Sequence, residues 1–351
     1  MGPRDGTAVQ CVAARIGSVV VARTKNTTHK QGRSGNPAKA ATPVRSKRRA
    51  TARDWIGGAR LRTLTLGVVP VVLGTTVGFV DSGTTGDFGA FLAQDGHLAI
   101  ALLALAVALF LQIGVNYSND YSDGVRGTDE YRVGPARLTG AGLAKPRTVL
   151  TVALTFFGLA AVAGIVIVVL TQLWWLLLVG AAAIVAAWFY TGGKKPYGYN
   201  ALGEVFVFVF FGLVAVLGTQ YVLIGQATTS GWAAAVAAGF FACAVLMVNN
   251  IRDIDEDRLA GKRTLAVVVG RPVARVLYGL FLLLPYVVLL WFVLLYFRTG
   301  FTYFSLLLAL PALAIGVSSR KPRELITALQ LSSFASLVFG VVLGITLAVQ
   351  P

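Results

Sequence analysis

Long apolar segments are the feature that most restricts how this chain of 351 residues can fold. A helix needs about 20 apolar residues to cross a bilayer. Nine segments approach that length: 61–80, 97–118, 148–170, 172–190, 201–224, 232–250, 273–296, 302–318 and 328–349. Charged residues make up only 13% of the chain, whereas they are about a quarter of a typical soluble domain. The sequence therefore predicts an all-α integral membrane protein in which residues 54–351 form nine transmembrane helices.

The basic residues are distributed asymmetrically around these segments. Of 31 Lys and Arg, 30 lie in the N-terminal segment or in loops on one side of the nine-helix arrangement, and only Arg298 lies on the other. Cytoplasmic loops of membrane proteins are enriched in Lys and Arg. We therefore expect a cytoplasmic N terminus and an external C terminus. The same asymmetry accounts for the net charge of +16 without a nucleic-acid partner.

Residues 1–53 differ in composition from the rest of the chain. They hold 12 basic residues against one acidic residue, Asp5, and contain no long apolar run. Segments of low hydrophobicity and high net charge do not fold on their own. The sequence predicts a disordered basic tail that reinforces the topology signal or contacts anionic membrane lipid.

Two acidic motifs end two of the apolar segments. They are GVNYSNDYSDGVRGTD (114–129) and VNNIRDIDEDRLAGKR (248–263). Residues three or four apart share a helix face, so each motif is expected to present one trio of oxygen-bearing side chains. These trios are Asn116, Asp120 and Asp123, and Asn249, Asp253 and Asp257. Crowded carboxylates repel one another unless a cation intervenes, and hard oxygen ligands suit Mg²⁺. The sequence therefore predicts a Mg²⁺ site at the cytoplasmic face.

Basic residues follow the acidic motifs on the same predicted side. They are Arg137, Lys194, Lys262 and Arg263. Arg and Lys bind phosphate oxygens, so acids, metal and cations together favour a diphosphate, and the apolar bundle favours a hydrocarbon tail. An allylic diphosphate would lose its leaving group there, and an aromatic acceptor would capture the cation. Taken alone, Lys194 and its neighbour Lys195 also fit a simple topology signal.

These motifs resemble those of the UbiA superfamily of membrane prenyltransferases. The resemblance covers residues 55–351 and lies in four runs, ARLRTLTLGVVPVVLGT (59–75), the first motif extended to Leu143, YTGGKKPYGYNALGEVFVFVFFGLVAVLGTQY (190–221) and NNIRDIDEDRLAGKRTLAVVVG (249–270). The last two are most similar to the 1,4-dihydroxy-2-naphthoate polyprenyltransferase branch. The resemblance implies nine helices around a central cavity that opens laterally to lipid. It also implies Mg²⁺-dependent transfer of a polyprenyl group from polyprenyl diphosphate to an aromatic acid, 1,4-dihydroxy-2-naphthoate, giving demethylmenaquinone for menaquinone biosynthesis.

Residue by residue, the resemblance implies a bacterial plasma-membrane enzyme with the following site. Asp120 and Asp253 are expected to be catalytic metal ligands, and Tyr190 is expected to lie beside the reaction centre. The remaining metal ligands and the four basic residues take the roles given above. The motifs do not specify the donor chain length, the acceptor-contacting residues or an oligomeric state.

Three other interpretations compete with this one. Within the superfamily, the acceptor could be 4-hydroxybenzoate or homogentisate. A CDP-alcohol phosphotransferase is disfavoured because DYSDG (120–124) is not followed by the rest of that pattern. A cation-coupled transporter predicts acids spread through the membrane depth, whereas the conspicuous acids here gather at one face.

Overall fold

A computed structural model describes residues 48–83, 87–128 and 137–349, and every regular element in these ranges is helical. The helices are α1 (Ala52–Gly58), η2 (Leu61–Thr63), α2 (Thr65–Asp81), α3 (Phe88–Ala93), α4 (His97–Arg126), α5 (Pro146–Thr171), α6 (Leu176–Phe189), η3 (Tyr197–Tyr199), α7 (Gly203–Val207), η4 (Phe208–Val214), α8 (Ala215–Ile224), α9 (Thr229–Arg252), α10 (Ile254–Leu259), α11 (Leu265–Leu295), η5 (Phe297–Ser305), α12 (Leu306–Ser318) and α13 (Pro322–Ala348). The all-α prediction is confirmed.

Each predicted apolar segment falls on a helix. In the described part of the chain, seven helices are long and apolar enough to cross a membrane. An eighth crossing arises if the helical stretch before Thr65 and α2 act together across their bend of 45°. The segment predicted at 172–190 forms α6, which has only 14 residues, or about 21 Å of helix at 1.5 Å per residue. Nine crossings therefore stay a prediction.

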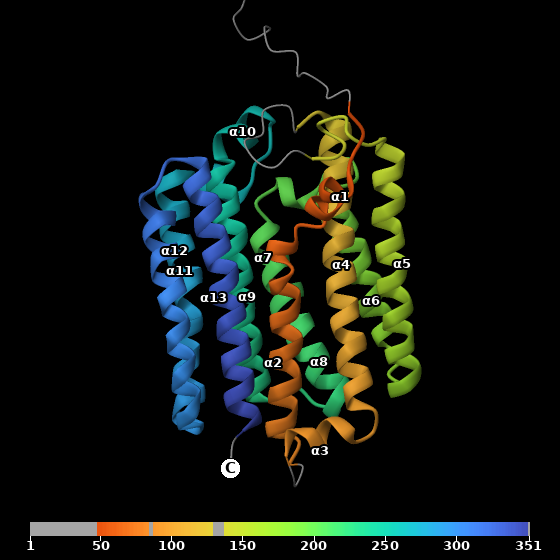
Figure 1. Cartoon of the computed structure of the whole chain (residues 1–351), viewed down its shortest axis with the longest axis vertical. Helices are drawn as coiled ribbons and strands as arrows, with labels where there is room; N and C mark the ends of the chain where they lie inside the picture. Colours follow the sequence, from red (N-terminus) through yellow and green to blue (C-terminus); the bar gives the residue numbers. More distant parts are fainter. Residues whose placement is uncertain (1–47, 84–86, 129–136, 350–351) are drawn as a thin grey trace, which may run out of the picture. The chain divides into compact units, whose positions relative to one another are not determined.

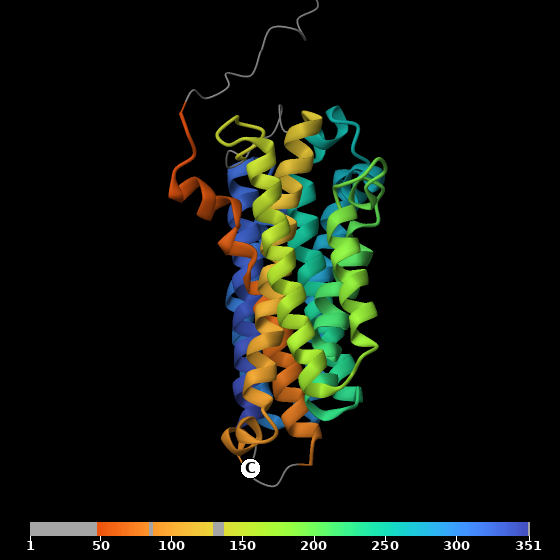
Figure 2. The same ribbon diagram turned by 90° about the vertical axis from the view of Figure 1, so that its right-hand side faces the viewer.

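The long helices run alongside one another (Figures 1 and 2). On one side of the bundle α9 packs against α11, and α13 packs against α12 and α2. On the other side α4 packs against α5, while α6 and α8 complete the wall around α4. Helix α10 lies at the end that also holds the start of α5, and α3 lies at the opposite end (Figure 1).

Helix α9 is the most enclosed helix of the bundle because its small residues let neighbours approach closely. Its buried positions include six alanines from Ala234 to Ala244, besides Gly231 and Gly239. Gly239 faces Gly212 of the π-helical segment η4, where a Cβ added to Gly212 would lie 2.6 Å from the carbonyl oxygen of Ala235. Small residues at such contacts allow helix backbones to pack tightly in membranes.

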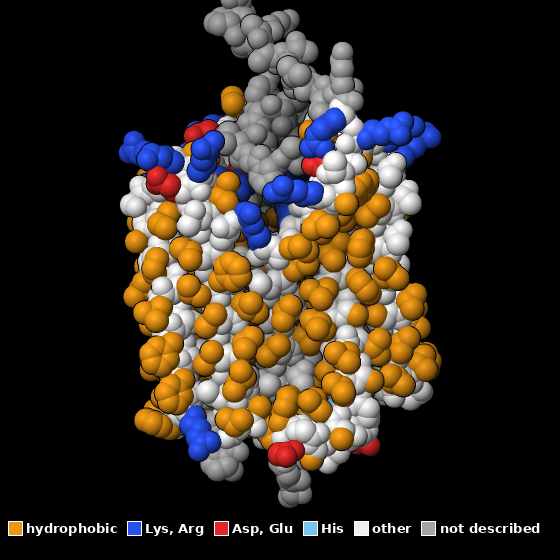
Figure 3. Space-filling view, viewed as in Figure 1, with side chains coloured by type: hydrophobic (Ala, Val, Ile, Leu, Met, Phe, Trp, Pro, Cys, Tyr) orange, Lys and Arg blue, Asp and Glu red, His pale blue; other side chains and the backbone are white. Residues whose placement is uncertain are grey.

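The surface has the polarity expected of a membrane protein. On the face shown in Figure 3, hydrophobic side chains cover the side of the bundle, and Lys and Arg gather mainly at the end that holds α10. Helix α6 has no buried residue although it is wholly apolar. Since water does not stabilise so large an apolar surface, the sides are suited to lipid.

The folded bundle starts slightly earlier than the sequence analysis placed it. The Thr51 side chain caps α1, and the backbone N–H of Ala50 donates to the carbonyl of Leu143 at 3.0 Å. Residues 48–53, assigned to the predicted tail, are therefore part of the described structure. The predicted disorder of residues 1–47 lies outside the described residues.

The contact between α9 and η4 predicts a clear stability effect. Gly212→Ala would place a Cβ 2.6 Å from the carbonyl oxygen of Ala235 in α9, so we expect the Tm of the detergent-purified protein to fall by several degrees. Gly158→Ala is the matched control, because nothing lies within 4 Å of a Cβ at this helical position in α5. Equal Tm values for the two variants would contradict the assigned packing.

Candidate active site

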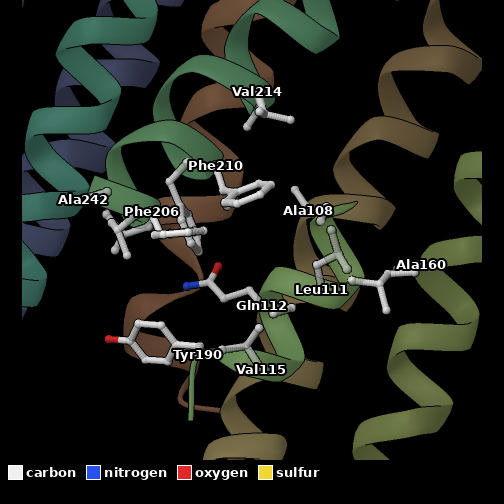
Figure 4. Close-up of a pocket in the computed structure, with 18 of the residues that line it drawn as sticks. Ala108, Leu111, Gln112, Val115, Ala160, Tyr190, Phe206, Phe210, Val214 and Ala242 are labelled. Carbon is white, nitrogen blue, oxygen red and sulfur yellow. The ribbon is translucent and has the colours of Figure 1, made fainter. Parts of the chain in front are cut away.

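A cavity of about 610 Å³ lies between the two sides of the bundle. Its walls come from α2, α4, α5, α6, η4, α8 and α9, and they are mainly apolar. Figure 4 shows part of this wall, where Phe206 and Phe210 face residues of α4. Polar and charged side chains line one end: Arg60, Asn116, Asn119, Asp123, Arg137, Asn249, Asn250, Asp253, Asp257 and Lys262. The cavity thus combines a charged mouth with an apolar body.

The first acidic motif is helical as far as Arg126, where α4 ends. The side chains of this motif that line the cavity are Asn116, Asn119 and Asp123. The expected trio contained Asp120 in place of Asn119. At 100° per residue, Asn119 and Asp120 lie on either side of the line that joins Asn116 and Asp123 along the helix. The rotation of α4 turns Asn119, rather than Asp120, toward the cavity.

Asp120 faces the loop before α5. Its two carboxylate oxygens accept hydrogen bonds from the backbone N–H groups of Leu138 and Thr139, each at 2.8 Å, and its side chain is buried. These bonds tie the loop to α4 directly after Arg137. In this structure, Asp120 therefore positions the loop that carries a cavity-lining cation.

The second acidic motif spans a helix break. Helix α9 ends at Arg252, Asp253 has φ −96° and ψ 10°, and α10 begins at Ile254. Asn249, Asp253 and Asp257 all line the cavity, as expected, although they do not share one continuous helix. Arg252, which the sequence analysis did not single out, is buried and pairs with Asp253, with Nε 2.6 Å from Oδ1.

The two motifs meet through Lys262. Its Nζ lies 3.4 Å from Oδ1 of Asp123 and 3.9 Å from Oδ1 of Asp257. Arg137 also pairs with Asp123 through its guanidinium group. A cation shared between carboxylates from α4 and α10 shows that these two acids face a common space.

Tyr199 holds three segments together at this point. Its hydroxyl donates a hydrogen bond to Asp123, and the Lys262 ammonium lies 4.7 Å from its ring centroid. Its carbonyl accepts from the N–H of Arg263 at 2.9 Å. Burial, followed by the negative charge of Asp123, raises the pKa of Tyr199 above its ordinary value. The hydroxyl consequently stays protonated and able to donate at neutral pH.

The remaining predicted residues fall into two groups, one that lines the cavity and one that does not. Tyr190, at the end of α6, lines the cavity, and its hydroxyl points away from Val115 and Gln112 (Figure 4). Lys194 and Arg263 are exposed at the same end and do not line the cavity. Only Arg137 and Lys262 of the four predicted diphosphate-binding residues therefore face the site directly.

The donor set suits Mg²⁺ shared with a ligand. Among the described residues, no group of three or more His, Cys, Asp or Glu side chains could hold a metal ion by itself. Mg²⁺ is usually held by one or two carboxylates together with waters and substrate phosphates. Asp123, Asp253 and Asp257, with the amide oxygens beside them, supply this chemistry at the cavity mouth.

Comparison with known proteins identifies the family. The model of the UbiA prenyltransferase family matches residues 84–338. The chain belongs to this family. A 1,4-dihydroxy-2-naphthoate octaprenyltransferase of Mycobacterium tuberculosis is 48% identical over 85% of this chain and 98% of the relative. The protein of the same name from Haemophilus influenzae is 32% identical, covering 84% of this chain and 96% of the relative.

Solved structures confirm that the chain has the UbiA fold. A UbiA homolog from Archaeoglobus fulgidus, bound to DMAPP and Mg²⁺, covers 83% of this UbiA-family chain at a TM-score of 0.54 and 17% identity. The alignment includes 99% of the homolog. The same homolog bound to GPP and Mg²⁺ gives a TM-score of 0.52 at 15% identity. With the seven apolar helices, family membership makes this chain an integral membrane protein.

Sequence reasoning missed several polar residues of the site. Asn119 and Arg252 lie inside the quoted motifs, but the expected spacing favoured their neighbours. Asn119 accepts a hydrogen bond from the Thr191 hydroxyl at 2.7 Å. Tyr199 lies in the quoted YGYN run and carried no chemical signal of its own, because its role arises only from its contact with α4.

Because Asp120 binds the loop before α5, its removal should lower the thermal stability of the protein, whereas removal of a surface acid should not. Asp120→Ala would orphan two buried N–H groups, each costing roughly 1–3 kcal/mol, so we expect a large fall in Tm. Asp255→Ala is the control, because the Asp255 side chain is 69% exposed and pairs with Arg271 at the surface, where such pairs contribute little. Thermal unfolding in detergent measures both. A wild-type Tm for Asp120→Ala would refute the loop-positioning role.

Proposed function

We propose that this chain transfers a polyprenyl group from polyprenyl diphosphate to 1,4-dihydroxy-2-naphthoate, in a Mg²⁺-dependent step of menaquinone biosynthesis. The observation that carries this proposal is the meeting of Asp123 and Asp257 at Lys262, at the charged end of a largely apolar cavity. This polarity suits a molecule with a diphosphate head and a hydrocarbon tail. The name of the relative at 48% identity supports the choice of acceptor.

The charged end supplies the groups that a departing diphosphate needs. The residues that would hold Mg²⁺ are Asp123 with Asn116 and Asn119 on α4, and Asp253 and Asp257 with Asn249 at the second motif. When bound, Mg²⁺ would offset the negative charge that develops on the diphosphate oxygens. Arg137 and Lys262, which pair with these carboxylates in the structure, are positioned to bind the same oxygens. Lys194 and Arg263, exposed nearby, would attract the anion at longer range.

The chemistry then proceeds in the apolar body of the cavity. The bond between C1 of the prenyl chain and the diphosphate oxygen breaks, and its electron pair leaves with the diphosphate. The ring carbon that bears the carboxylate bonds to C1, and CO₂ departs while its bonding pair stays with the ring. One acceptor anion and one prenyl diphosphate thus give the quinol form of demethylmenaquinone, CO₂ and diphosphate.

Aromatic side chains and the dry walls would protect the allylic cation. Phe206 stacks on Tyr197 with ring centroids 3.9 Å apart, and both line the cavity beside Tyr190. Aromatic faces attract cations, and apolar walls delay capture by water. Tyr190 is thereby assigned a place beside the reacting carbon, near the polar end.

The same proposal includes an orientation in the membrane. The basic end of the bundle, which carries the site, would face the cytoplasm of a bacterial cell. The N terminus would lie on that side and the C terminus outside, with α6 completing nine crossings. The exposed apolar sides would contact lipid, and the donor would enter from the bilayer.

Neutralising one acid from each motif tests the metal assignment. We expect Asp123→Asn and Asp253→Asn each to reduce prenyl transfer by about 100-fold or more, because charge stabilisation at the leaving group is lost. The assay follows radiolabelled polyprenyl diphosphate into lipid-soluble product. Asp255→Asn is the surface control and should retain wild-type activity. Full turnover by either site variant in a folded state would refute the assignment.

A panel of acceptors tests the substrate assignment. Purified protein is incubated with labelled donor, Mg²⁺ and one of 1,4-dihydroxy-2-naphthoate, 4-hydroxybenzoate or homogentisate. We expect product with the naphthoate only, and none when a chelator removes Mg²⁺. Product with only hydroxybenzoate or homogentisate would select the alternative acceptor. No product with any acceptor, from folded protein, would contradict prenyl transfer and leave the transporter interpretation.

A further inference from the structure

Gln112 is a buried polar residue in the apolar part of the cavity wall. It lies on α4 four residues before Asn116, and 6% of its surface is exposed. Ala108, Leu111 and Val115 surround it on the same wall (Figure 4). At 1.5 Å per residue it lies about 6 Å along α4 from Asn116 and about 10 Å from Asn119, and therefore just below the charged end.

Only half of the Gln112 amide is satisfied by the protein. Its Nε2 donates to the carbonyl oxygen of Thr63 at 2.6 Å, which fixes the orientation of the amide. Its Oε1 is buried and has no hydrogen-bond donor among the described residues. The amide extends from α4 toward Phe206 on the facing wall (Figure 4). A buried acceptor without a donor is unfavourable, so the arrangement favours a ligand that supplies one.

Gly67 of α2 makes room for this oxygen. A Cβ added to Gly67 would lie 2.8 Å from Oε1 of Gln112, closer than real Cβ atoms come to other atoms. Gly67 itself also lines the cavity. The amide oxygen therefore lies between α4 and α2, as an unpaired acceptor in a part of the cavity wall that is mainly apolar.

The chemistry of the two substrates decides which of them can pair with the Gln112 oxygen. A prenyl diphosphate offers only acceptor oxygens and a hydrocarbon chain, so it cannot donate a hydrogen bond to Oε1. A hydroxylated aromatic acid can donate through its ring hydroxyl. We propose that Gln112 binds a hydroxyl of the aromatic acceptor and thereby selects hydroxylated rings. This inference rests on the proposed prenyl transfer and adds a residue that recognises the acceptor.

The binding mode follows from the surrounding groups. The acceptor ring would lie against Phe206 and Phe210, with one hydroxyl on Gln112 and its reacting carbon toward the charged end. Aromatic rings favour such stacked or tilted contacts. A site built to bind a hydroxyl discriminates strongly against an analogue that lacks it, because the buried protein group is then left unpaired.

Equilibrium binding of matched acids tests the inference. The ligands are 1-hydroxy-2-naphthoate, 4-hydroxy-2-naphthoate and 2-naphthoate, together with 4-hydroxybenzoate and benzoate, and the protein is the full chain in detergent. In the wild type, at least one hydroxylated acid should bind about tenfold more tightly than its deoxy partner. In Gln112→Met, which keeps the side-chain length and removes the acceptor, this ratio should fall to about 1. The KM for the prenyl diphosphate should stay unchanged.

A second variant separates binding from folding. Gly67→Ala leaves Gln112 in place but crowds its oxygen, so it should reduce the same ratio even if Gln112→Met fails to fold. Gly158→Ala, on the outer face of α5, should keep the wild-type ratio. Equal discrimination by the wild type and the folded variants, or none in the wild type, would overturn the role of Gln112.

The panel also distinguishes failure of the inference from failure of the proposed function. If the protein prenylates only a benzoate, the naphthoate assignment fails, and the hydroxybenzoate–benzoate pair still tests Gln112. If naphthoate is prenylated and Gln112→Met still discriminates, the inference alone fails.

Discussion

The balance of charge around Asp123 is the constraint on which the site depends. A carboxylate at the end of a transmembrane helix is stable only when cations or hydrogen-bond donors satisfy it. Arg137, Lys262 and Tyr199 do this, and they come from three separate segments that connect the long helices. Satisfying one acid therefore brings together segments that lie far apart in the sequence, and it places Asp257 in the same space. The diphosphate site that we propose is a consequence of this local electrostatic requirement.

The rest of the fold supports this cluster from both sides. Asp120 fixes the loop that carries Arg137, and the contact between Tyr199 and Arg263 fixes the segment that carries Lys262. Close packing of α9 against η4 sets the position of the second motif. Functional groups are more precisely oriented when such supporting contacts hold them. Asp123, Asp253 and Asp257 thus face the cavity, whereas Asp120 positions the loop beside it.

The apolar body of the cavity recognises a ligand by other means than its charged end does. Its walls are contributed by residues with no chemistry of their own, and they select a ligand by shape and by excluding water. Within such a wall, one unsatisfied amide has a large effect because few other groups can orient a ring. The charged end would therefore recognise the prenyl donor, and the Gln112 amide would recognise the aromatic acceptor.

The sequence by itself determined the helical membrane class, the charge asymmetry and the two acidic motifs, because apolar length and residue type are local properties of the chain. The tertiary structure decided which neighbours face the cavity. Asn119 and Asp120 lie on either side of the line from Asn116 to Asp123, so only the packing of α4 against α5 and its preceding loop selects between them. Tyr199, Arg252 and Gln112 likewise acquire roles only through contacts with distant segments, and such contacts leave no local pattern in a sequence.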